Sequence, residues 1–418
     1  MTDIKYYKIK FRLASPLAIG SGENYHTDSD IILDSRGTPV IPATAFAGII
    51  RHYLDIECND ESEIFGYING TKSSQSRVKF YDASIMTESF VTVRDHVALE
   101  NKVGIKGAKF DMEALEANSE FVTLFELHDY KGYDSKIREA IYALNSGILR
   151  IGSKTSRGYG QIKIIDIRER EFTLPSDREK WINFEPYNYE NNDEYGENII
   201  QTIVEENHNF NDRFTTIHLE LSQQGAVSIR SYTVKNPDDI SSADYVQLSS
   251  NDNIPVIPGT SWAGAFRERF SEFARDEETV IELYGFVDAN NKTQKKSKIY
   301  FSESRISGGI SKIITRNSID RFSAGTKDGA LYTEKTYYNG KTSLNIIINN
   351  SVKDIRKDMK IISAVICDLD RGHLAVGGLT SVGRGIFSVD SIAVNGKDIT
   401  EAMKALNISE MAGVIEND

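Results

Sequence analysis

The sequence predicts an α+β fold built from two tandem copies of one unit. A stretch of thirteen residues, PVIPATAFAGIIR at 39–51, recurs as PVIPGTSWAGAFR at 255–267 with eight identical positions. A Gly-rich stretch, LRIGSKTSRGYGQIKI at 149–164, has a counterpart at 374–389. Between these landmarks the strand and helix patterns follow the same order in both halves, which indicates a duplicated unit.

Residue periodicity and turn residues define the elements of the first copy. In chain order they are a half-buried strand at 4–13, a glycine turn at 15–23, a helix at 45–54, a short apolar element at 64–68, strands at 76–85 and 120–127, a helix at 134–147, and strands on both sides of a Gly-rich loop within 149–164. Pro42 opens the first helix and Thr44 is its cap. Asp134 or Ser135 caps the later helix. Since Gly48 disfavours a helix, we expect another backbone to approach it closely.

A polar stretch at 93–115 interrupts this order and is predicted to leave the core as a hairpin-like excursion, with 315–332 as its counterpart. The offset between the copies grows from 216 to 225 residues, as small loop insertions in a shared fold would produce. Each unit therefore has a mostly antiparallel sheet with helices on one side, compatible with a ferredoxin-like fold.

The predicted boundaries are 1–185 for the first unit, 186–213 for a linker and 214–418 for the second unit. The linker is acidic and rich in asparagine. We expect it to be solvated, with one short helix around Asn198–Val204.

Composition excludes several classes of protein. The net charge of −12 argues against a non-specific nucleic-acid or membrane binder but leaves room for a local basic groove. Cys58 and Cys367 are the two cysteines, so neither a disulfide framework nor a zinc cluster is expected, and both are predicted to be buried free thiols. The N-terminus has no signal-peptide core, and no apolar run reaches membrane length, so we predict a cytoplasmic protein without a membrane partner.

The Gly-rich loop of the first copy is the leading candidate for ligand binding. Its residues are Gly152, Ser153, Lys154, Thr155, Ser156, Arg157 and Gly158, and the second copy supplies Gly377, Gly378, Thr380, Ser381 and Arg384. Glycines let backbone N–H groups face phosphates, while basic and hydroxyl side chains add charge and donors. A tight hairpin that needs glycine for positive φ explains the same pattern, and both interpretations stay open.

Two further sets of side chains are candidates for RNA contacts. Arg51 and Arg267 share one position in the repeated stretch and favour a phosphate contact or a structural network over a plain surface role. Phe110, Phe322 and Tyr332 lie in or beside the excursions, where aromatic rings stack on bases or anchor a hairpin to its domain.

Three aspartates, Asp28, Asp30 and Asp34, cluster in one turn region near His26. Carboxylates beside a phosphate-binding groove can hold Mg²⁺ or orient a 2′-hydroxyl for in-line attack. A solvated acidic loop is the alternative. His26 is close enough in sequence to act as a general acid or base, although a lone loop histidine is more often only polar.

The ordered set of motifs resembles the RAMP superfamily of CRISPR-associated proteins. The stretches that carry the resemblance are SPLAIGSGE, TDSDIILDSRGTPVIPATAFAGIIR, IFG, RVKFYDA, RDHVALENKVGIKGAKFD and IGSKTSRGYGQIKI. The chain is most similar to the Csm/Cmr backbone subunits of type III effector complexes, as a tandem fusion like those of type III-D systems. The resemblance covers nearly all of the first unit and most of the second.

This resemblance implies a modified RRM palm in each unit and a thumb-like hairpin that crosses the guide–target duplex. Guide (CRISPR) RNA would be held through its backbone by the start of the repeated helix and by the Gly-rich loop, while base pairing reads the sequence. The implied partners are guide RNA, complementary target RNA and other type III effector subunits.

The resemblance also implies cleavage of target RNA by an aspartate with Mg²⁺ or Mn²⁺. The family's catalytic and metal-binding aspartate falls on Asp28. In the second unit we assign the matched position to Ala243, so that Asp244 serves only after a one-residue adjustment, with Asp238 and Asp239 as further candidates.

Three functions remain open from the sequence. The first is a tandem backbone subunit that binds guide RNA and cleaves target RNA as a metal-dependent endoribonuclease. The second is the same scaffold without cleavage, in which Asp28 is only a polar loop residue. The third is a metal-independent ribonuclease that processes guide RNA, for which only His26 is suitably placed.

Overall fold

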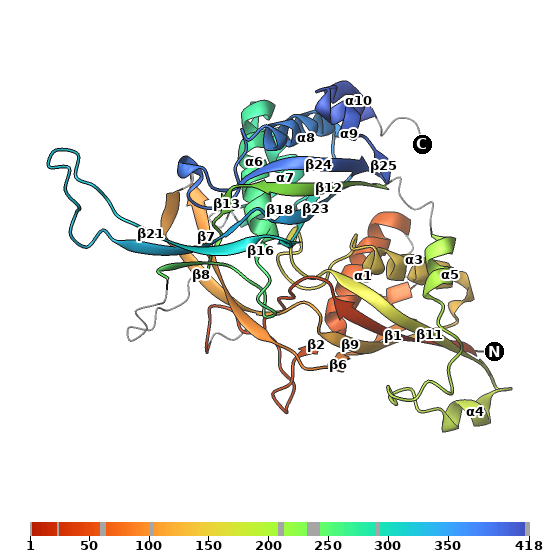
Figure 1. The fold of residues 1–418 in the computed structure, drawn as a ribbon. Coiled ribbons are helices and arrows are strands. Elements are labelled where there is room, and N and C mark those ends of the chain that lie inside the picture. The colour runs from red at the N-terminus through yellow and green to blue at the C-terminus, as the bar shows by residue number, and fades with distance from the viewer. Residues whose placement is uncertain are drawn as a thin grey trace. The chain divides into compact units, whose positions relative to one another are not determined.

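The computed structural model describes residues 2–22, 25–58, 64–100, 103–207, 213–231, 243–288 and 292–413 (Figure 1). The chain forms two compact units. The first contains Met1–Thr155 and Tyr159–Phe210, and the second contains Ser156–Gly158 and Asn211–Asp418. Within the described ranges, no helix is long and apolar enough to cross a membrane.

The first unit is built on a six-stranded sheet in the order β11-β1-β9-β6-β2, with β5 also paired to β9. Its strands are β1 (Thr2–Leu13), β2 (Val40–Ile41), β3 (Tyr67–Asn69), β4 (Lys72–Ser74), β5 (Val78–Phe80), β6 (Ala83–Ile85), β7 (Val91–Glu100), β8 (Val103–Leu115), β9 (Glu120–His128) and β11 (Ile162–Leu174). Its helices are α1 (Ala43–Cys58), η1 (Tyr130–Gly132), α3 (Asp134–Asn145), α4 (Arg178–Asn183) and α5 (Ile200–Glu206). The sequence β1-α1-β5/β6-β9-α3-β11, with β1 and β9 in the middle of an antiparallel sheet, is the ferredoxin-like fold that the sequence predicts.

The second unit repeats this order. Its main sheet runs β10-β19-β23-β12-β24-β25, so β24, β12, β23 and β19 occupy the places of β11, β1, β9 and β5. Its strands are β10 (Arg157–Gly158), β12 (Phe214–Gln224), β13 (Ala226–Val227), β14 (Arg230–Ser231), β15 (Tyr245–Gln247), β16 (Val256–Ile257), β17 (Phe286–Asp288), β18 (Thr293–Lys295), β19 (Ile299–Ser302), β20 (Ser304–Arg305), β21 (Ile310–Arg316), β22 (Tyr332–Tyr338), β23 (Lys341–Asn349), β24 (Ile386–Val394) and β25 (Lys397–Asp398). Its helices are α6 (Gly259–Ala274), α7 (Glu277–Tyr284), α8 (Ile355–Asp370), η3 (Thr380–Val382), α9 (Thr400–Lys404) and α10 (Ile408–Gly413).

The helices of the repeated stretch pack on their sheets through one apolar stripe. In α1 the buried residues include Phe46, Ile50 and Leu54. The matched positions of α6 are Trp262, Phe266 and Phe270, which belong to the core of the second unit. The spacing of four residues places each set on one face of a helix, and this spacing is what made both helices predictable.

Strand β1 is buried on both faces, so the prediction of a half-buried strand is wrong. On one face Phe11 packs edge-on against Phe46 of α1, with ring centroids 5.9 Å apart. On the other face Tyr6 packs against Phe184, at 5.1 Å. The polar residues in the alternating pattern of 4–13 include Lys5 and Lys8. Both side chains are buried and contact protein groups instead of solvent. Lys8 Nζ, for example, donates to the carbonyl oxygen of Asn191 at 2.7 Å.

The segment that covers this second face was predicted to be a solvated linker, and this prediction is partly wrong. Between 186 and 207, Tyr195 and Ile203 are buried, and Tyr195 belongs to one apolar cluster with Ile4, Tyr6 and Phe172. A short helix does form, as α5, close to the predicted place. Apolar residues spaced among the asparagines and carboxylates anchor this acidic segment to the first sheet.

Three local predictions about α1 and α3 fail for identifiable reasons. Thr44 lies inside α1, and the N–H of Ala43 donates instead to Asp82 Oδ1 at 2.7 Å. A Cβ built on Gly48 meets no atom within 4 Å among the described residues, so no backbone approaches it there. Asp134 does not cap α3, because its carboxylate accepts from Lys5 Nζ at 2.8 Å and from the hydroxyl of Tyr7 at 2.6 Å.

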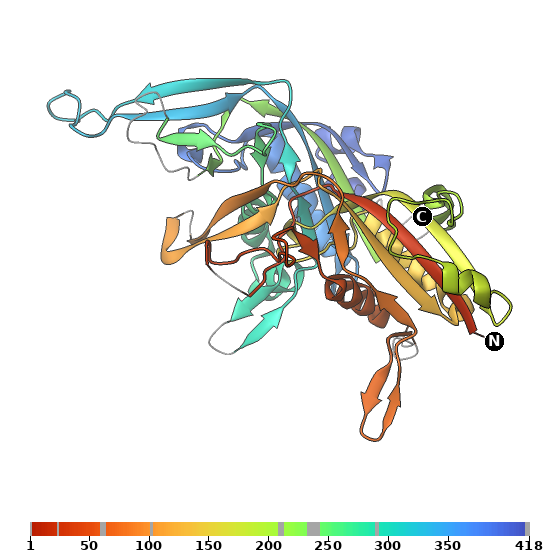
Figure 2. The ribbon, with the colours of Figure 1, turned by 90° about the horizontal axis from the view of Figure 1, so that it is seen from below.

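Other strand predictions need revision as well. The strand predicted at 76–85 is divided into β5 and β6, and no strand precedes the Gly-rich loop within 149–156. The excursion at 93–115 is a hairpin, as predicted, formed by β7 and β8. In the second unit β21 and β22 pair in the same way, and β22 also pairs with β13 and, in parallel, with β15. Figure 2 shows β21 and β22, in cyan, as a long extended pair.

Cys367 is a buried free thiol on α8, as predicted. The same helix also buries Asp358, which is 3% exposed. Burial and, second, the charge of Asp354 raise the pKa of Asp358 to about 7. In the folded protein this carboxyl therefore holds its proton more tightly than in the unfolded chain. Its ionisation penalty is absent below about pH 4, grows from pH 4 to pH 7 and is complete above pH 7.

We therefore expect Asp358→Asn to stabilise the second unit at pH 8 by about 1–3 kcal/mol, and by much less at pH 5, because the amide removes the buried charge. Urea unfolding at the two pH values measures the difference. Asp328→Asn, at an exposed aspartate of the same unit, is the control. A stabilisation that is equal at both pH values would contradict the assignment.

Candidate functional site

Of the three clustered aspartates, Asp30 and Asp34 shape the loop itself. Asp30 is buried and accepts hydrogen bonds from the backbone N–H groups of Tyr25, His26 and Thr27 at 2.7 to 3.1 Å. Burial raises the pKa of Asp30, but these bonds and the Thr27 hydroxyl lower it further, to about 2. Asp34 accepts from the N–H groups of residues 36 and 38, which closes a turn.

Asp28 differs from both because it is exposed and is tied to the excursion. Its carboxylate Oδ2 accepts from the N–H of Asp111 on β8 at 3.0 Å. In return, the N–H of Asp28 donates to Asp111 Oδ1 at 2.9 Å. Two residues after Asp111 on β8, the N–H of Glu113 donates to the carbonyl oxygen of Ser29 at 3.0 Å. The aspartate loop therefore lies along the second strand of the hairpin.

This geometry tests whether the predicted metal fits. No group of three or more His, Cys, Asp or Glu side chains in the described ranges could hold a metal ion, so the three aspartates do not form a cage. Mg²⁺, however, often binds through one or two carboxylates together with waters and substrate phosphates. The exposed Asp28 carboxylate fits that role, and the two turn-forming aspartates do not.

The second unit places Asp244 where the first places Asp28. Asp244 Oδ2 accepts from the N–H of Thr333 on β22 at 2.6 Å, and Thr333 is the counterpart of Asp111. Both aspartates lie eleven residues before the first proline of the repeated stretch. The assignment of the matched position to Ala243 is therefore wrong by one residue, and Asp244 needs no loop adjustment. Asp238 and Asp239 lie outside the described residues.

Both Gly-rich loops are closed by the same backbone hydrogen bonds. The N–H of Ile151 donates to the carbonyl oxygen of Gly160 at 2.8 Å, and the matched bond from Val376 to Gly385 is 2.9 Å long. The N–H of Gly160 donates to Pro16, and that of Gly385 to Ala226, both at 2.8 Å. Each loop is thus fixed to the turn that follows the first strand of its unit.

Several loop amides and side chains that were predicted to face phosphates are already engaged. In the first loop, the N–H of Ser153 donates to the carbonyl oxygen of Ala18 at 2.8 Å. Its counterpart Gly378 donates to Ser228 at the same distance. Gly152 and Gly377 have positive φ and lie close to the same two segments, so a side chain at either position would collide. The hairpin interpretation accounts for these glycines, as it does for Gly158, whose φ is +95°.

The remaining residues of the first loop, Lys154, Thr155 and Ser156, each contact another protein group. Lys154 places its Nζ 4.0 Å from the ring centroid of Phe110. The carbonyl oxygen of Thr155 accepts from Arg150 Nη1 at 2.9 Å, and that of Ser156 accepts from the N–H of Phe301. Thr380 and Ser381, in the second loop, lie in the exposed 3₁₀ turn η3.

Arg384 is buried, so its geometry argues against the predicted RNA contact. Its Nη2 lies 3.3 Å from Glu334 Oε2, and its Nη1 donates to the hydroxyl of Tyr338 at 3.1 Å. The matched residues in the first unit are Tyr159 and Met112, which share one apolar cluster. The loop and the excursion thus meet at one point in each unit, through an ion pair in one and through apolar side chains in the other.

Two predicted arginines come together in the second unit. Residues 157–158 form β10, which runs parallel to β19 at the edge of the main sheet. Arg157 is exposed, and its pKa is lowered by partial desolvation and then by the positive charge of Arg267. Among the described residues, neither guanidinium has a hydrogen bond or ion pair with a protein group. Together these two guanidiniums form a basic site that has no carboxylate partner within the described ranges.

Protein groups contact the starts of both repeated helices, where the resemblance implies a phosphate contact. In α1 the first N–H is held by Asp82. In α6 a Cβ on Gly259 would lie 2.5 Å from the carbonyl carbon of Arg157, so the loop backbone covers the helix start. Arg51 is exposed on α1, at the position that corresponds to Arg267 on α6.

The three aromatic candidates, Phe110, Tyr332 and Phe322, have different environments. Phe110 has one ring face stacked on His96, at 5.1 Å, and Lys154 above the ring, so it anchors the hairpin rather than presenting a free stacking face. Tyr332 packs edge-on against Tyr245 at 6.0 Å. Phe322 is 96% exposed, and Asp320 fixes the turn that carries it by accepting from the N–H groups of Phe322 and Ser323.

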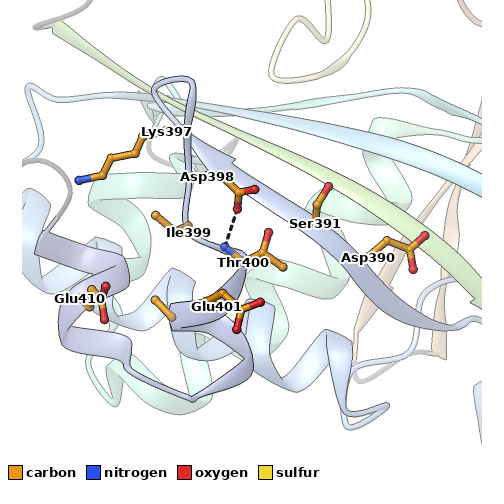
Figure 3. A pocket seen from close by; sticks show the side chains of 9 residues that line it. Asp390, Ser391, Lys397, Asp398, Ile399, Thr400, Glu401 and Glu410 are labelled. Atoms are coloured by element: carbon orange, nitrogen blue, oxygen red, sulfur yellow. Dashed lines mark hydrogen bonds between the residues drawn. The ribbon is translucent and has the colours of Figure 1, made fainter.

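A pocket of about 410 Å³ lies elsewhere in the second unit, between β24, β25 and α9 (Figure 3). Its polar side chains include Asp390, Asp398 and Glu401. Asp398 accepts from the N–H of Thr400 at 2.8 Å and so belongs to a turn. None of the candidate residues lines this pocket, and we assign it no role.

The structure therefore defines a tandem protein of two ferredoxin-like units, each with a glycine-closed loop, a hairpin excursion and an aspartate held against that excursion. Residues 10–163 and 236–388 match the RAMP superfamily, and the chain belongs to that family. RAMP proteins generally bind CRISPR RNA in multi-subunit complexes, which indicates a CRISPR-associated RNA-binding subunit. No curated protein matches the chain significantly.

The contact between loop and excursion makes a stability prediction. Arg384→Tyr should destabilise the second unit by about 2–4 kcal/mol, because Glu334, only 1% exposed, would lose its close partner. Adding Glu334→Met should recover most of that loss by recreating the apolar pairing of the first unit. Urea unfolding of the single and double variants measures this coupling, and simple additivity of the two losses would contradict it.

Proposed function

We propose that the chain is a tandem backbone subunit of a type III CRISPR effector complex. It binds guide RNA and cleaves complementary target RNA at two aspartate sites that depend on Mg²⁺ or Mn²⁺. The observation that supports this most directly is the matched placement of Asp28 and Asp244. Each lies at the same distance from the repeated helix and accepts the same backbone bond from the second strand of an excursion.

Each aspartate would act at a phosphodiester that the neighbouring excursion sets in place. A divalent metal held by the carboxylate would neutralise charge on the scissile phosphate. The RNA supplies its own nucleophile, since the 2′-hydroxyl lies beside that phosphate. The protein's part is to hold one exposed carboxylate at a fixed place on a rigid strand, and the bonds from β8 and β22 do this.

Guide binding is supported by the unpaired guanidiniums of Arg157 and Arg267. In a chain of net charge −12, two adjacent cations that have no carboxylate partner in the part of the chain that the structure describes form a local site for a phosphate. Arg51 marks the corresponding helix position in the first unit. A non-cleaving scaffold is the second candidate, because a purely structural loop aspartate would also make the bond seen between Asp28 and Asp111.

Cleavage is tested in the complex loaded with guide, with labelled complementary RNA and Mg²⁺. Asp28→Ala should abolish one set of cuts, Asp244→Ala should abolish the other, and the double variant should bind target without cutting it. Asp193→Ala, at an exposed aspartate outside both loops, is the control. If the double variant cuts at every site, the chain is a scaffold and the aspartate assignment is wrong.

Guide binding is tested by Arg157→Ala and Arg267→Ala. Each should weaken retention of guide RNA several-fold, and each lost phosphate contact should reduce the slope of log affinity against log salt by about 1. Filter binding over a salt series measures both quantities.

Arg269→Ala is the matched control, because this arginine lies on the same helix but is already paired with Asp368 at 2.7 Å and with Glu272. An equal loss of retention in the control would remove the specific role of the pair.

A further inference from the structure

We propose that Asp111 is the positioning residue for Asp28, and that its replacement by Thr333 makes the two cleavage sites unequal. This inference rests on the proposed function and deepens it. Asp111 lies 83 positions beyond Asp28 in the chain, and it is brought there only because β8 runs along the aspartate loop.

The two aspartates form a closed pair of hydrogen bonds. The N–H of Asp111 donates to the Asp28 carboxylate at 3.0 Å, and the Asp111 carboxylate accepts from the N–H of Asp28 at 2.9 Å. The first bond orients the side chain of Asp28, and the second fixes the backbone that carries it. An exposed aspartate without such bonds would populate several rotamers, and ordering it at each turnover would cost free energy.

A second carboxylate on β8 extends this control along the loop. Glu113 Oε2 accepts from the N–H of Ile31 at 3.0 Å, and the N–H of Glu113 donates to Ser29 at 3.0 Å. Asp95 is the strand partner of Asp111, and its charge is paired with Lys109 at 3.0 Å. The carboxylate of Asp111 therefore acts on the loop as a hydrogen-bond acceptor, next to a strand partner whose charge is already paired.

The second unit keeps one half of this arrangement. The N–H of Thr333 still donates to Asp244, at 2.6 Å. Thr333 has no carboxylate with which to hold the backbone of the aspartate in return. The segment that follows is held instead by parallel strand pairing, with Tyr245 opposite Glu334 and Val246 opposite Lys335. The bond that orients the Asp244 side chain is thus kept, while the residue that donates it carries a hydroxyl in place of the carboxylate of Asp111.

The first experiment uses the guide-loaded complex in the Asp244→Ala background, so that only the first site cuts. Asp111→Ala should lower the single-turnover cleavage rate about tenfold while target affinity and guide retention stay unchanged. Asp111→Asn should retain most of the rate, because its amide oxygen can still accept from the N–H of Asp28.

Rescue by asparagine separates positioning from other roles. If Asp111→Asn is as slow as Asp111→Ala and recovers only at higher Mg²⁺, the carboxylate acts through its charge and the positioning inference is overturned. If Asp111→Ala cuts at the wild-type rate, the inference is also overturned. Should Asp28→Ala leave the first set of cuts intact, the proposed function itself is wrong.

The converse experiment uses the Asp28→Ala background, in which only the second site cuts. Thr333→Asp should raise the rate at that site severalfold by supplying a carboxylate at the position of Asp111, with target affinity unchanged. Thr333→Asn should give a similar gain, because the amide oxygen accepts equally well. No gain with either variant would show that the two sites do not differ in the way proposed.

Discussion

One close backbone crossing in each unit fixes the geometry on which the rest depends. A side-chain carbon on Gly160 would lie 1.8 Å from the carbonyl oxygen of Ile151, and one on Gly385 would lie 2.0 Å from that of Val376. Only glycine permits this approach. The crossing closes the Gly-rich loop, fixes it to the turn after the first strand, and so brings the excursion, the aspartate loop and the last strand of the sheet together.

Around this shared backbone, the two copies make equivalent contacts with chemically different side chains. Where the first unit packs Tyr159 near Met112, the second pairs Arg384 with Glu334. Where the first closes its aspartate loop with two carboxylates, the second uses strand pairing. The backbone framework is common to both copies, whereas the side chains at these two contacts differ between them.

The sequence was sufficient for the fold because the fold depends on local patterns. The four-residue spacing of Phe46, Ile50 and Leu54 predicts a helix, and the repeat of the whole motif predicts two units with one topology. Prediction from the sequence failed where the partner of a residue lies far along the chain. Lys8 of β1, for example, looks like a solvent-facing residue until its partners Asn191 and Tyr195, more than 180 residues away, are seen.

The candidate site shows the same division. The motif count found Asp28, and a corrected count finds Asp244, because both precede the repeated helix by a fixed interval. Asp111 was missed, since nothing in its local sequence distinguishes it from other hairpin residues. The burial of Arg384 and the meeting of Arg157 with Arg267 depend on tertiary contacts across 50 and 110 residues, which no spacing rule contains.

The alternative pairing at positions 112/159 and 334/384 also bears on how a duplicated gene keeps its halves distinct. Recombination between the repeats that carried over only the loop would place an arginine beside Met112, or a tyrosine beside Glu334. The first chimera would bury an arginine beside an apolar side chain, and the second would leave Glu334 with only the more distant Arg316, at 4.0 Å, so each would cost stability. Exchanges that separate the two positions are therefore expected to give less stable chains than exchanges that move both together.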